Sequence, residues 1–589
     1  MSEESITLTI DGQKVSVPRD TTILDAAKKL HINIPTLCYS EELPVEGACR
    51  VCVVEIEGRP RLEPACATQV AEGMKIKTNS PRVRTARKLI LELLLASHPE
   101  ECTTCEKSQK CELEKLAHDL GVREVRFEKV DKHFVQDLSS PSLIRDPNKC
   151  ILCGRCVRMC REVQSVRVID FANRGENTKV TTAFERGIND IECTTCGQCI
   201  LVCPTGALQE KSTIDKVWEA LADPSKFVVV QTAPAVRSAI GEEFGMEAGS
   251  LVTGKMTAAL RRLGFDKVFD TQFGADLTIT EEAHELVERI ENKGALPMIT
   301  SCSPGWVKYI EHFFPRCLEH LSTCRSPQQM FGPIAKTYYA KKAKIDPRNL
   351  YVVSIMPCTA KKFEARRPEM CAAFEYWRRK GKVREDERFP DVDAVITTRE
   401  AARMLKEVGI DFPNLPEEEF DAPLGISTGA GTIFGVTGGV MEAALRTAYE
   451  WLTGKSLGKV EFKQVRGFEG IRTASISMNG FEAKVAVAHG LDNARVLLEE
   501  VQQGRSPYHF IEIMACPGGC LGGGGQPIPT NSEVRVKRAA ALYTEDERKS
   551  IRKSHENPAI QQLYKEFLGE PGSERAHHLL HTTYTERGL

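Results

Sequence analysis

The chain has 589 residues, too many for one hydrophobic core, so we expect several domains. Its formal net charge of -2 gives no basic field for nucleic acid, and 41% hydrophobic residues argue against disorder. The sequence contains no run of about 18 apolar residues, so we expect no membrane span, and its first residues do not resemble a signal peptide. Because 22 cysteines without a secretion signal favour metal sites over disulfides, we expect a cytoplasmic protein from a reducing, anaerobic setting.

The first predicted module, residues 1–78, combines a hairpin, a helix and four cysteines. Apolar and polar residues alternate around Asp11-Gly12, and residues 20–30 read as a helix capped by Asp20 or Thr21. This order predicts a small β-grasp domain. Its cysteines are Cys38, Cys49, Cys52 and Cys66. Four thiolates suit a [2Fe–2S] cluster; a structural zinc is the alternative, but zinc more often uses two CxxC pairs.

The second module, residues 79–125, carries one histidine upstream of three cysteines. Its apolar run at 89–96, LILELLLA, reads as a buried helix segment. The potential ligands are His98, Cys102, Cys105 and Cys111. Three cysteines leave one position of a [4Fe–4S] cluster open, and His98 is the nearest candidate to fill it. A neutral imidazole would raise the cluster's potential. The alternative is an ordinary surface histidine.

The third module, residues 126–210, contains two copies of the bacterial ferredoxin run C-x2-C-x2-C-x3-C. In such pairs the fourth cysteine of each run serves the other cluster. The first [4Fe–4S] ligand set is then Cys150, Cys153, Cys156 and Cys203. The second set is Cys193, Cys196, Cys199 and Cys160. Gly154 and Gly197 have no side chain, so we expect the backbone to approach the inorganic sulfurs there.

The last region, residues 211–589, alternates helical patterns with short β-rich runs. The runs are KFVVVQTAP at 226–234, YVVSIMPC at 351–358, DAVITT at 393–398 and EAKVAVAHG at 482–490. This pattern predicts a large α/β domain with more than one sheet. Its remaining cysteines fall in three loops, at 300–306, 356–365 and 510–527. They are Cys302, Cys358, Cys516 and Cys520.

These loops, TSCSPGW, MPCTAKKFEA and FIEIMACPGGCLGGGGQP, resemble the three signatures of [FeFe]-hydrogenases, and the match runs from residue 1 to RAHHLLH near the C-terminus. The domain order resembles the clostridial-type enzyme with four accessory cluster sites and the catalytic subunit of multi-subunit, NAD(P)-linked hydrogenases, which include electron-bifurcating complexes. The first two modules also resemble the start of complex I large subunits. The resemblance implies reversible H2 formation from protons and electrons. It also implies a two-lobed domain holding an H-cluster: a [4Fe–4S] cubane joined to a diiron unit with CO, cyanide and an azadithiolate.

The resemblance assigns roles to single residues. Cys358, Cys516 and Cys520 are implied cubane ligands, and Cys520 also bridges to the diiron unit. Lys361 is implied to hydrogen-bond a cyanide, since a cation suits an anion. The implied lining of the cofactor is Pro234, Ala235, Gln328, Met356 and Met514. Ala235 stands where the clostridial-type enzyme has serine.

The first loop departs from the family pattern, which has two adjacent cysteines before the proline. Here the pair is Cys302-Ser303. In strict register Cys302 is the terminal proton donor and Ser303 takes the fourth ligand position, although a hydroxyl is a poor iron ligand. Alternatively Cys302 binds the cubane and Ser303 or water relays the proton.

The resemblance also implies a proton path. Its members are Cys302, Glu282, Ser322, Glu285 and Arg289. Glu282, Glu285 and Arg289 fall at i, i+3 and i+7 of a predicted helix and therefore share one of its faces. The alternative is a solvated acidic face. The three leftover cysteines, Cys317, Cys324 and Cys371, are interpreted as small buried apolar residues.

We therefore predict one [2Fe–2S] cluster, three accessory [4Fe–4S] clusters and the H-cluster, with H2 and protons as substrates. No flavin or nicotinamide site is visible, so electrons are expected to pass to ferredoxin or to NAD(P)H-linked flavin subunits. Dedicated maturases are expected to build the diiron unit. Two rival functions are an electron-transfer subunit without its own chemistry and an iron–sulfur assembly factor.

Overall fold

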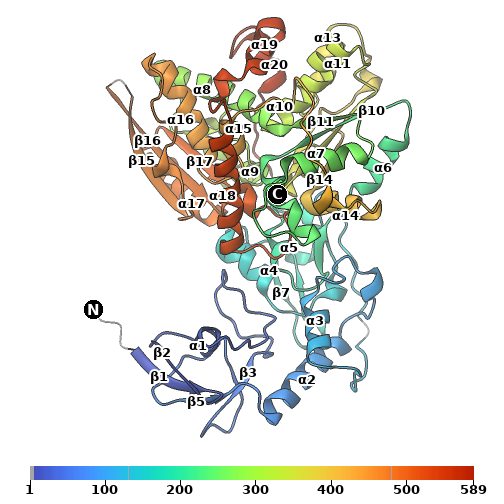
Figure 1. Cartoon of the computed structure of the whole chain (residues 1–589), viewed down its shortest axis with the longest axis vertical. Coiled ribbons are helices and arrows are strands. Elements are labelled where there is room, and N and C mark those ends of the chain that lie inside the picture. The colour runs from blue at the N-terminus through green and yellow to red at the C-terminus, as the bar shows by residue number, and fades with distance from the viewer. Residues whose placement is uncertain (1–4, 131, 479, 589) are drawn as a thin grey trace. The chain divides into compact units, whose positions relative to one another are not determined.

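The computed structural model describes residues 5–130, 132–478 and 480–588, which form two compact units (Figure 1). The first unit contains the chain up to Val163 together with Arg167–Ile191 and Cys199–Gln209. The second contains Gln164–Val166, Glu192–Gln198 and everything from Glu210 onward. Cys193 and Cys196 therefore group with the C-terminal region, although the third predicted module ends only at residue 210. Each unit is described by itself.

A β-grasp sheet opens the first unit. Its strands are β1 (Ser5–Ile10), β2 (Gln13–Pro18), β3 (Val53–Ile56), β4 (Glu63–Pro64) and β5 (Lys75–Lys77), in the order β2-β1-β5-β3-β4. The hairpin around Asp11-Gly12 is confirmed, because β1 and β2 pair antiparallel. Helix α1 (Ile23–Lys29) begins later than predicted: Thr22, not Asp20 or Thr21, is the cap, since its Oγ1 accepts from the Asp25 backbone N at 3.1 Å.

The rest of the first unit is short helices and two-stranded sheets. They are α2 (Pro81–Ala96), α3 (Glu112–Asp119), α4 (Arg155–Arg158), α5 (Gln198–Val202), β6 (Leu143–Arg145) with β9 (Leu208–Glu210), and β7 (Asp170–Ala172) with β8 (Lys179–Thr181); the first residue of α5 and the last of β9 group with the second unit. The run at 89–96 is helical, but the prediction that it is buried was wrong in part. Leu91 is buried, whereas Leu89 and Leu93 are 39% and 49% exposed, because one face of α2 points to solvent.

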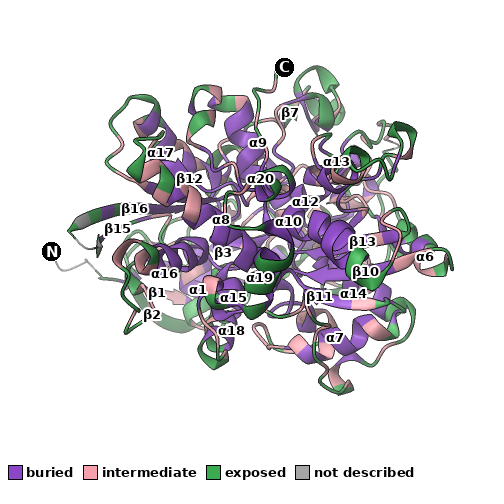
Figure 2. Cartoon of the chain, turned by 90° about the horizontal axis from the view of Figure 1, so that it is seen from above, coloured by how far each residue is buried: buried purple, intermediate pink, exposed green. Residues whose placement is uncertain are grey.

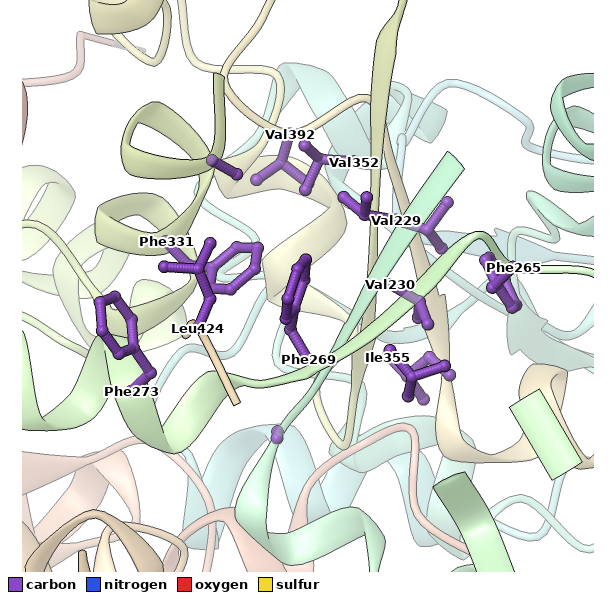
Figure 3. Close-up of a cluster of buried hydrophobic side chains, with 14 of the residues drawn as sticks. Val229, Val230, Phe265, Phe269, Phe273, Phe331, Val352, Ile355, Val392 and Leu424 are labelled. Carbon is purple, nitrogen blue, oxygen red and sulfur yellow. The ribbon is translucent and has the colours of Figure 1, made fainter. Parts of the chain in front are cut away.

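The first sheet of the second unit is wholly parallel. Its strands are β10 (Phe227–Thr232), β11 (Lys267–Asp270), β13 (Leu350–Met356) and β14 (Ala394–Thr397), in the order β11-β10-β13-β14. Val229, Val230, Val352 and Ile355 from its central strands pack with Phe269 in one apolar core (Figure 3). Strands this rich in Val and Ile are expected where helices cover both faces of a sheet.

The second sheet is mixed. Its strands are β12 (Met298–Ile299), β15 (Ile471–Met478), β16 (Phe481–His489) and β17 (Phe510–Met514), in the order β12-β17-β16-β15 with only β15 antiparallel. All four β-rich runs predicted from the sequence are therefore strands, and they fall in two sheets. The long helices beside these sheets present buried faces (Figure 2).

The helices of the second unit complete its two α/β lobes. They are α6 (Ile214–Ala222), α7 (Thr253–Arg262), α8 (Thr271–Glu291), α9 (Pro304–Phe313), α10 (Pro327–Ile334), α11 (Ala340–Ala343), α12 (Ala360–Glu364), α13 (Ala372–Arg379), α14 (Thr398–Glu407), α15 (Gly429–Ile433), α16 (Gly439–Thr453), α17 (Leu491–Gln502), α18 (Ser532–Arg548), α19 (Pro558–Leu563) and α20 (Glu574–Leu580). Among the described residues no helix is both long and apolar enough to cross a membrane.

Candidate active site

Three loops converge on one cavity of about 70 Å³ in the second unit. The loops follow the carboxyl ends of β13 in the first sheet and of the parallel pair β12 and β17 in the second, and such strand ends are where open α/β sheets place ligands. Four cysteines, one from each of two loops and two from the third, line the cavity: Cys302, Cys358, Cys516 and Cys520. The fold therefore brings together thiols that are far apart in the sequence, and all four line the same chamber.

The glycine-rich third loop closes against its neighbours where a side chain would clash. Gly519 has φ +83°, and a Cβ there would lie 2.7 Å from the Thr437 backbone N. The Gly525 backbone N donates to the Pro357 carbonyl at 2.8 Å, which ties the third loop to the second. Glycine is required here both for its left-handed conformation and for close packing of backbone on backbone.

The cavity's donor set fits an iron–sulfur centre. Burial, followed by the proximity of Cys358, raises the pKa of Cys520 to about 12, and burial raises that of Cys516 well above its ordinary value. Within the described part of the chain, the buried Gln328 Oε1 has no hydrogen-bond partner although Gln328 lines the cavity. Clustered soft thiols with an orphaned acceptor are poorly satisfied by protein alone, and thiolates are the ligands that iron–sulfur clusters take.

One cation borders the cavity. The Lys361 ammonium donates to the Cys302 carbonyl at 3.2 Å and forms a 2.9 Å ion pair with Glu364. Gln328 Nε2 also donates to Glu364, at 3.1 Å. Glu364 was missed from the sequence; its position three residues after Lys361, on the same face of α12, is a signal that could have found it. The carboxylate holds both cavity-lining side chains in place.

Cys302 and Ser303 have different neighbours. Cys302 packs in the apolar cluster of Met514, Ala275 and Phe434, and burial followed by the nearby Glu282 raises its pKa well above the ordinary value. Ser303 caps α9, and its Oγ accepts from the Ala515 backbone N at 3.2 Å, one residue before Cys516. The thiol therefore lies near the acidic helix, whereas the hydroxyl lies beside the loop that carries Cys516.

The acidic face of α8 is buried at one end and reaches solvent at the other. Glu282 is 1% exposed, its carboxylate oxygens have no hydrogen-bond partner among the described residues, and burial followed by Glu285 raises its pKa to about 8. Ser322 Oγ donates to Glu285 at 2.8 Å, and Glu285 pairs with Arg289 at 2.7 Å. The side chains of Glu285 and Arg289 are 12% and 14% exposed, so this end of the acidic face of α8 reaches solvent.

Of the other residues predicted to line the cofactor, four line the cavity and one does not. Pro234, Gln328, Met356 and Met514 line the cavity. Ala235 is not among the lining residues; its carbonyl accepts from Gln526 Nε2 at 3.0 Å and its side chain packs with Leu542. The sequence analysis missed six lining residues that lie outside the three loops, because single residues there carry no motif: Ala233, Thr271, Ala275, Pro327, Phe434 and Gly435.

In the first unit, the four cysteines of the β-grasp domain come together. The Cys52 and Cys66 sulfurs lie 3.4 Å apart, and the Cys49 backbone N donates to the Cys38 sulfur at 3.5 Å. Cys38 and Cys66 also lie close enough to share a hydrogen bond. Segments from the loop and from after β4 thus meet as a four-thiol cage.

His98 is placed in a setting that keeps it neutral. Burial, followed by Lys132 and Lys149, lowers its pKa to about 4, and its Nδ1 is buried without a partner among the described residues. A neutral ring with a free nitrogen can bind a metal. Burial raises the pKa values of Cys102 and Cys111, and Cys105 is a further cause for both, so its thiol lies near each of them.

The ferredoxin-like cysteines are brought together in part. Cys150, Cys153, Cys156 and Cys203 line one small cavity in the first unit, as the exchanged-ligand pattern predicts. The second set, Cys160, Cys193, Cys196 and Cys199, is divided between the two units and stays a prediction. Gly197 has φ +72°, and within the second unit a Cβ there would clash with Thr359 and Gly524. Close packing on the active-site loops is therefore one reason for glycine at this position.

Fold and site together define an iron–sulfur oxidoreductase: clustered cysteines on small modules, and a buried thiol-lined chamber beside a helix with a partly buried acidic face. Residues 226–524 match the family described as iron only hydrogenase large subunit, C-terminal domain, and residues 532–587 match the iron hydrogenase small subunit. Residues 3–81 match a 2Fe-2S iron-sulfur cluster binding domain. Residues 87–126 match the NADH-ubiquinone oxidoreductase-G iron-sulfur binding region, and 140–209 the ferredoxin-like domain of NADH-quinone oxidoreductase subunit 3.

Individual relatives agree with the family matches. The chain is 54% identical to the NADP-reducing hydrogenase subunit HndD of Solidesulfovibrio fructosivorans, over 99% of both chains. It is 44% identical to iron hydrogenase 1 of Clostridium pasteurianum, over 98% of this chain and 99% of that one. A solved [FeFe]-hydrogenase, HydA1 from Chlamydomonas reinhardtii, is 44% identical with a TM-score of 0.56, covering 63% of this chain and 99% of that one. The chain belongs to the iron-only, or [FeFe], hydrogenase family. It is an enzyme that interconverts H2 with protons and electrons, and it carries [2Fe–2S] and [4Fe–4S] domains that relay electrons.

Proposed function

We propose that Cys358, Cys516, Cys520 and Ser303 hold the cubane of the H-cluster, with Cys520 also joined to the diiron unit. The single observation that supports this most is the convergence of three strand-end loops on one thiol-lined chamber. When bound, the H-cluster supplies the H2-binding and redox chemistry. Lys361 and Gln328, both anchored by Glu364, offer hydrogen-bond donors to its anionic ligands.

In this proposal Cys302 is the terminal proton donor and Ser303 occupies the fourth ligand position. Cys302 has Glu282 as its strongest charged influence, whereas the Ser303 hydroxyl lies next to the loop that carries Cys516. The strict register of the family is therefore preferred over the alternative in which Cys302 binds the cubane.

Replacing Ser303 with alanine is expected to weaken the cubane, because the fourth position then has no protein ligand. In enzyme produced without maturases, which lacks the diiron unit, we expect Ser303→Ala to change the electron paramagnetic resonance spectrum of the reduced cubane and to lower iron content. Ser303→Cys should retain iron with a shifted spectrum. If all three proteins give the same spectrum and iron content, Ser303 is not a ligand.

The side chains on α8 carry protons between solvent and the chamber. We assign the order Arg289, Glu285, Ser322, Glu282 and Cys302. A buried carboxyl group with a pKa near neutrality can both donate and accept, which suits the position of Glu282 between a thiol and a hydroxyl. Glu285 exchanges its proton with Ser322 Oγ on one side and faces the Arg289 guanidinium on the other.

The pKa of Glu282 is raised to about 8, so we expect the rates of H2 production and H2 oxidation to depend on pH in opposite ways. Below pH 8 this group is protonated and can donate towards Cys302, so H2 production should fall as the pH rises through about 8. H2 oxidation needs the deprotonated form as acceptor and should fall as the pH drops through about 8. Voltammetry at constant overpotential between pH 5.5 and 9.5 measures both. Rates that change with pH in the same direction would contradict the assignment.

Electron-transfer partners complete the function. We infer one [2Fe–2S] cluster at Cys38, Cys49, Cys52 and Cys66 and three accessory [4Fe–4S] clusters at the cysteine sets given above, with His98 as a ligand. The partner is proposed to be an NAD(P)H-linked flavin subunit, with or without ferredoxin. The printed name of the NADP-reducing relative and the NADH-quinone oxidoreductase-like modules support this choice. Maturases are proposed to install the diiron unit.

Purification from the native source tests the partner proposal. We expect a flavoprotein to copurify and NAD(P)-dependent H2 chemistry to appear only in the complex. Isolation of a lone chain that reacts with ferredoxin alone would contradict the multi-subunit assignment. We infer a reducing, cytoplasmic location, because most of the 22 cysteines are proposed cluster ligands, which such a compartment keeps reduced.

A further inference from the structure

A cluster of three donor atoms lies at the solvent end of the acidic helix, and only one of its members, Glu285, belongs to the proposed proton path. Glu285 on α8, Cys324 before α10 and His581 after α20 each offer one ligand atom, and these atoms all lie within 4.8 Å of one another. The Cys324 sulfur is 3.8 Å from Glu285 Oε2 and 4.0 Å from His581 Nδ1. The three elements come together in one corner of the second unit (Figure 1).

The backbone fixes the two distant members side by side. Cys324 and His581 form an isolated antiparallel bridge, flanked by a 2.8 Å hydrogen bond from Arg325 N to the Leu580 carbonyl and another from Thr582 N to the Thr323 carbonyl. Both side chains are buried, at 0% and 7% exposure. The thiol and the imidazole therefore meet because of backbone pairing, and their approach does not depend on flexible side chains.

The histidine is oriented as metal-binding histidines are. Its Nε2 lies 3.1 Å from Glu281 Oε2, and Glu281 also accepts from the Gly572 backbone N at 2.9 Å and from the Tyr564 hydroxyl. The tautomer with hydrogen on Nε2 lets the imidazole donate to this carboxylate as a further donor. The lone pair is thereby left on Nδ1, the nitrogen nearest Cys324. A carboxylate behind the imidazole is the usual outer partner of a metal-bound histidine.

We propose that Glu285, Cys324 and His581 form a binding site for a thiophilic divalent cation, with Zn²⁺ as the best match. One thiolate, one imidazole and one carboxylate are a donor set that zinc accepts, with solvent in the fourth position. Zinc–ligand distances of about 2.0–2.3 Å require the three atoms to draw together by roughly 1 Å. The Thr323 hydroxyl, now 2.8 Å from His581 Nδ1, must turn away to free the lone pair.

Nearby negative charge and a route from solvent both favour binding of a cation at this site. Glu281, Glu282 and Glu285 all act on the Cys324 thiol, whereas Arg289 is the cation paired with this group of carboxylates. A metal ion can enter past Glu285 and Arg289, whose side chains are partly exposed. Binding would draw the Glu285 carboxylate away from Ser322 and Arg289. This consequence rests on the proposed proton path: a bound cation would interrupt it and inhibit the enzyme.

Zinc titration of the mature holoenzyme tests the site, because the clusters then occupy the cysteines proposed to bind them. We expect Zn²⁺ to inhibit H2 production, and Cys324→Ala or His581→Gln to raise the half-inhibitory concentration at least tenfold without changing activity in zinc-free buffer. Glu281→Gln should raise it about tenfold, as loss of an outer partner does. Two matched controls should leave inhibition unchanged. Cys317→Ala removes another buried thiol. His555→Gln alters the unrelated group of Glu450, His555 and Glu556.

Zinc K-edge absorption gives a readout that is independent of activity. One equivalent of bound Zn²⁺ should show a single sulfur at about 2.3 Å with nitrogen and oxygen at about 2.0–2.2 Å, and the sulfur should vanish in Cys324→Ala. Zinc without a sulfur ligand, zinc with four sulfurs, or no bound zinc overturns the site. A correct spectrum without inhibition keeps the metal site and removes Glu285 from the proton path, so the two proposals fail separately.

Discussion

Replacing Glu282 with glutamine is expected to lower H2 production and oxidation by at least about 100-fold, because glutamine can neither donate nor accept a proton in this relay. The buried carboxyl has no hydrogen-bond partner among the described residues, so the amide should fit with little structural change. Activity with an artificial electron donor measures the effect. Infrared and paramagnetic spectra of the clusters should stay the same, which separates a proton-transfer defect from loss of cofactor.

Glu288→Gln is the matched control for this prediction. Glu288 lies on the same helix, six residues along, and is exposed to solvent. It should retain full activity. Equal losses in both variants would mean that the charge of α8, and not a specific relay through Glu282, matters. Full activity in Glu282→Gln would remove this residue from the path.

Replacing Cys516 with alanine is expected to abolish H2 chemistry, because the cubane would lose a buried thiolate that nothing nearby can replace. Its neighbours among the described residues include the other thiols, the Ser303 hydroxyl, which is itself a proposed ligand, and the Gln198 amide, which is a poor iron ligand. Iron content should fall, and the spectrum of the cubane should be lost while those of the accessory clusters remain. Activity and iron analysis on anaerobically purified protein measure the effect.

Cys317→Ala is again the control, since Cys317 is equally buried and does not line the chamber. It should leave iron content and activity unchanged, with at most a modest loss of stability from the small cavity. Retention of the cubane spectrum in Cys516→Ala would show that the three loops do not jointly hold this cluster.

Local sequence patterns predicted the strands of the second unit well, whereas the cluster ligand sets stay predictions. Val- and Ile-rich runs such as 226–234 became parallel strands, because a fully buried strand leaves a continuous apolar pattern. The cap of α1 was misplaced because Asp20, Thr21 and Thr22 are all able to cap, and only the folded turn selects among them. The exposure of Leu89 and Leu93 was missed because an all-apolar run does not reveal which face of its helix lacks a partner.

Features that depend on tertiary contacts were less accessible. Family resemblance supplied the residues of the chamber, but only the fold separates the neighbours of Cys302 from those of Ser303, since adjacent residues can point to different sides of a loop. Phe434 carries no motif. Cys324 was interpreted as a plain apolar filler, and His581, 257 residues away, approaches it only through backbone pairing at the end of the chain.

Infrared spectroscopy of the matured enzyme tests the central claim most directly. The chamber formed by Cys358, Cys516 and Cys520 is expected to hold a diiron unit, so CO and cyanide stretching bands should be present in the wild type and absent from Cys516→Ala. A wild-type protein that has been exposed to competent maturases, contains its accessory clusters and still shows no such bands would contradict the account.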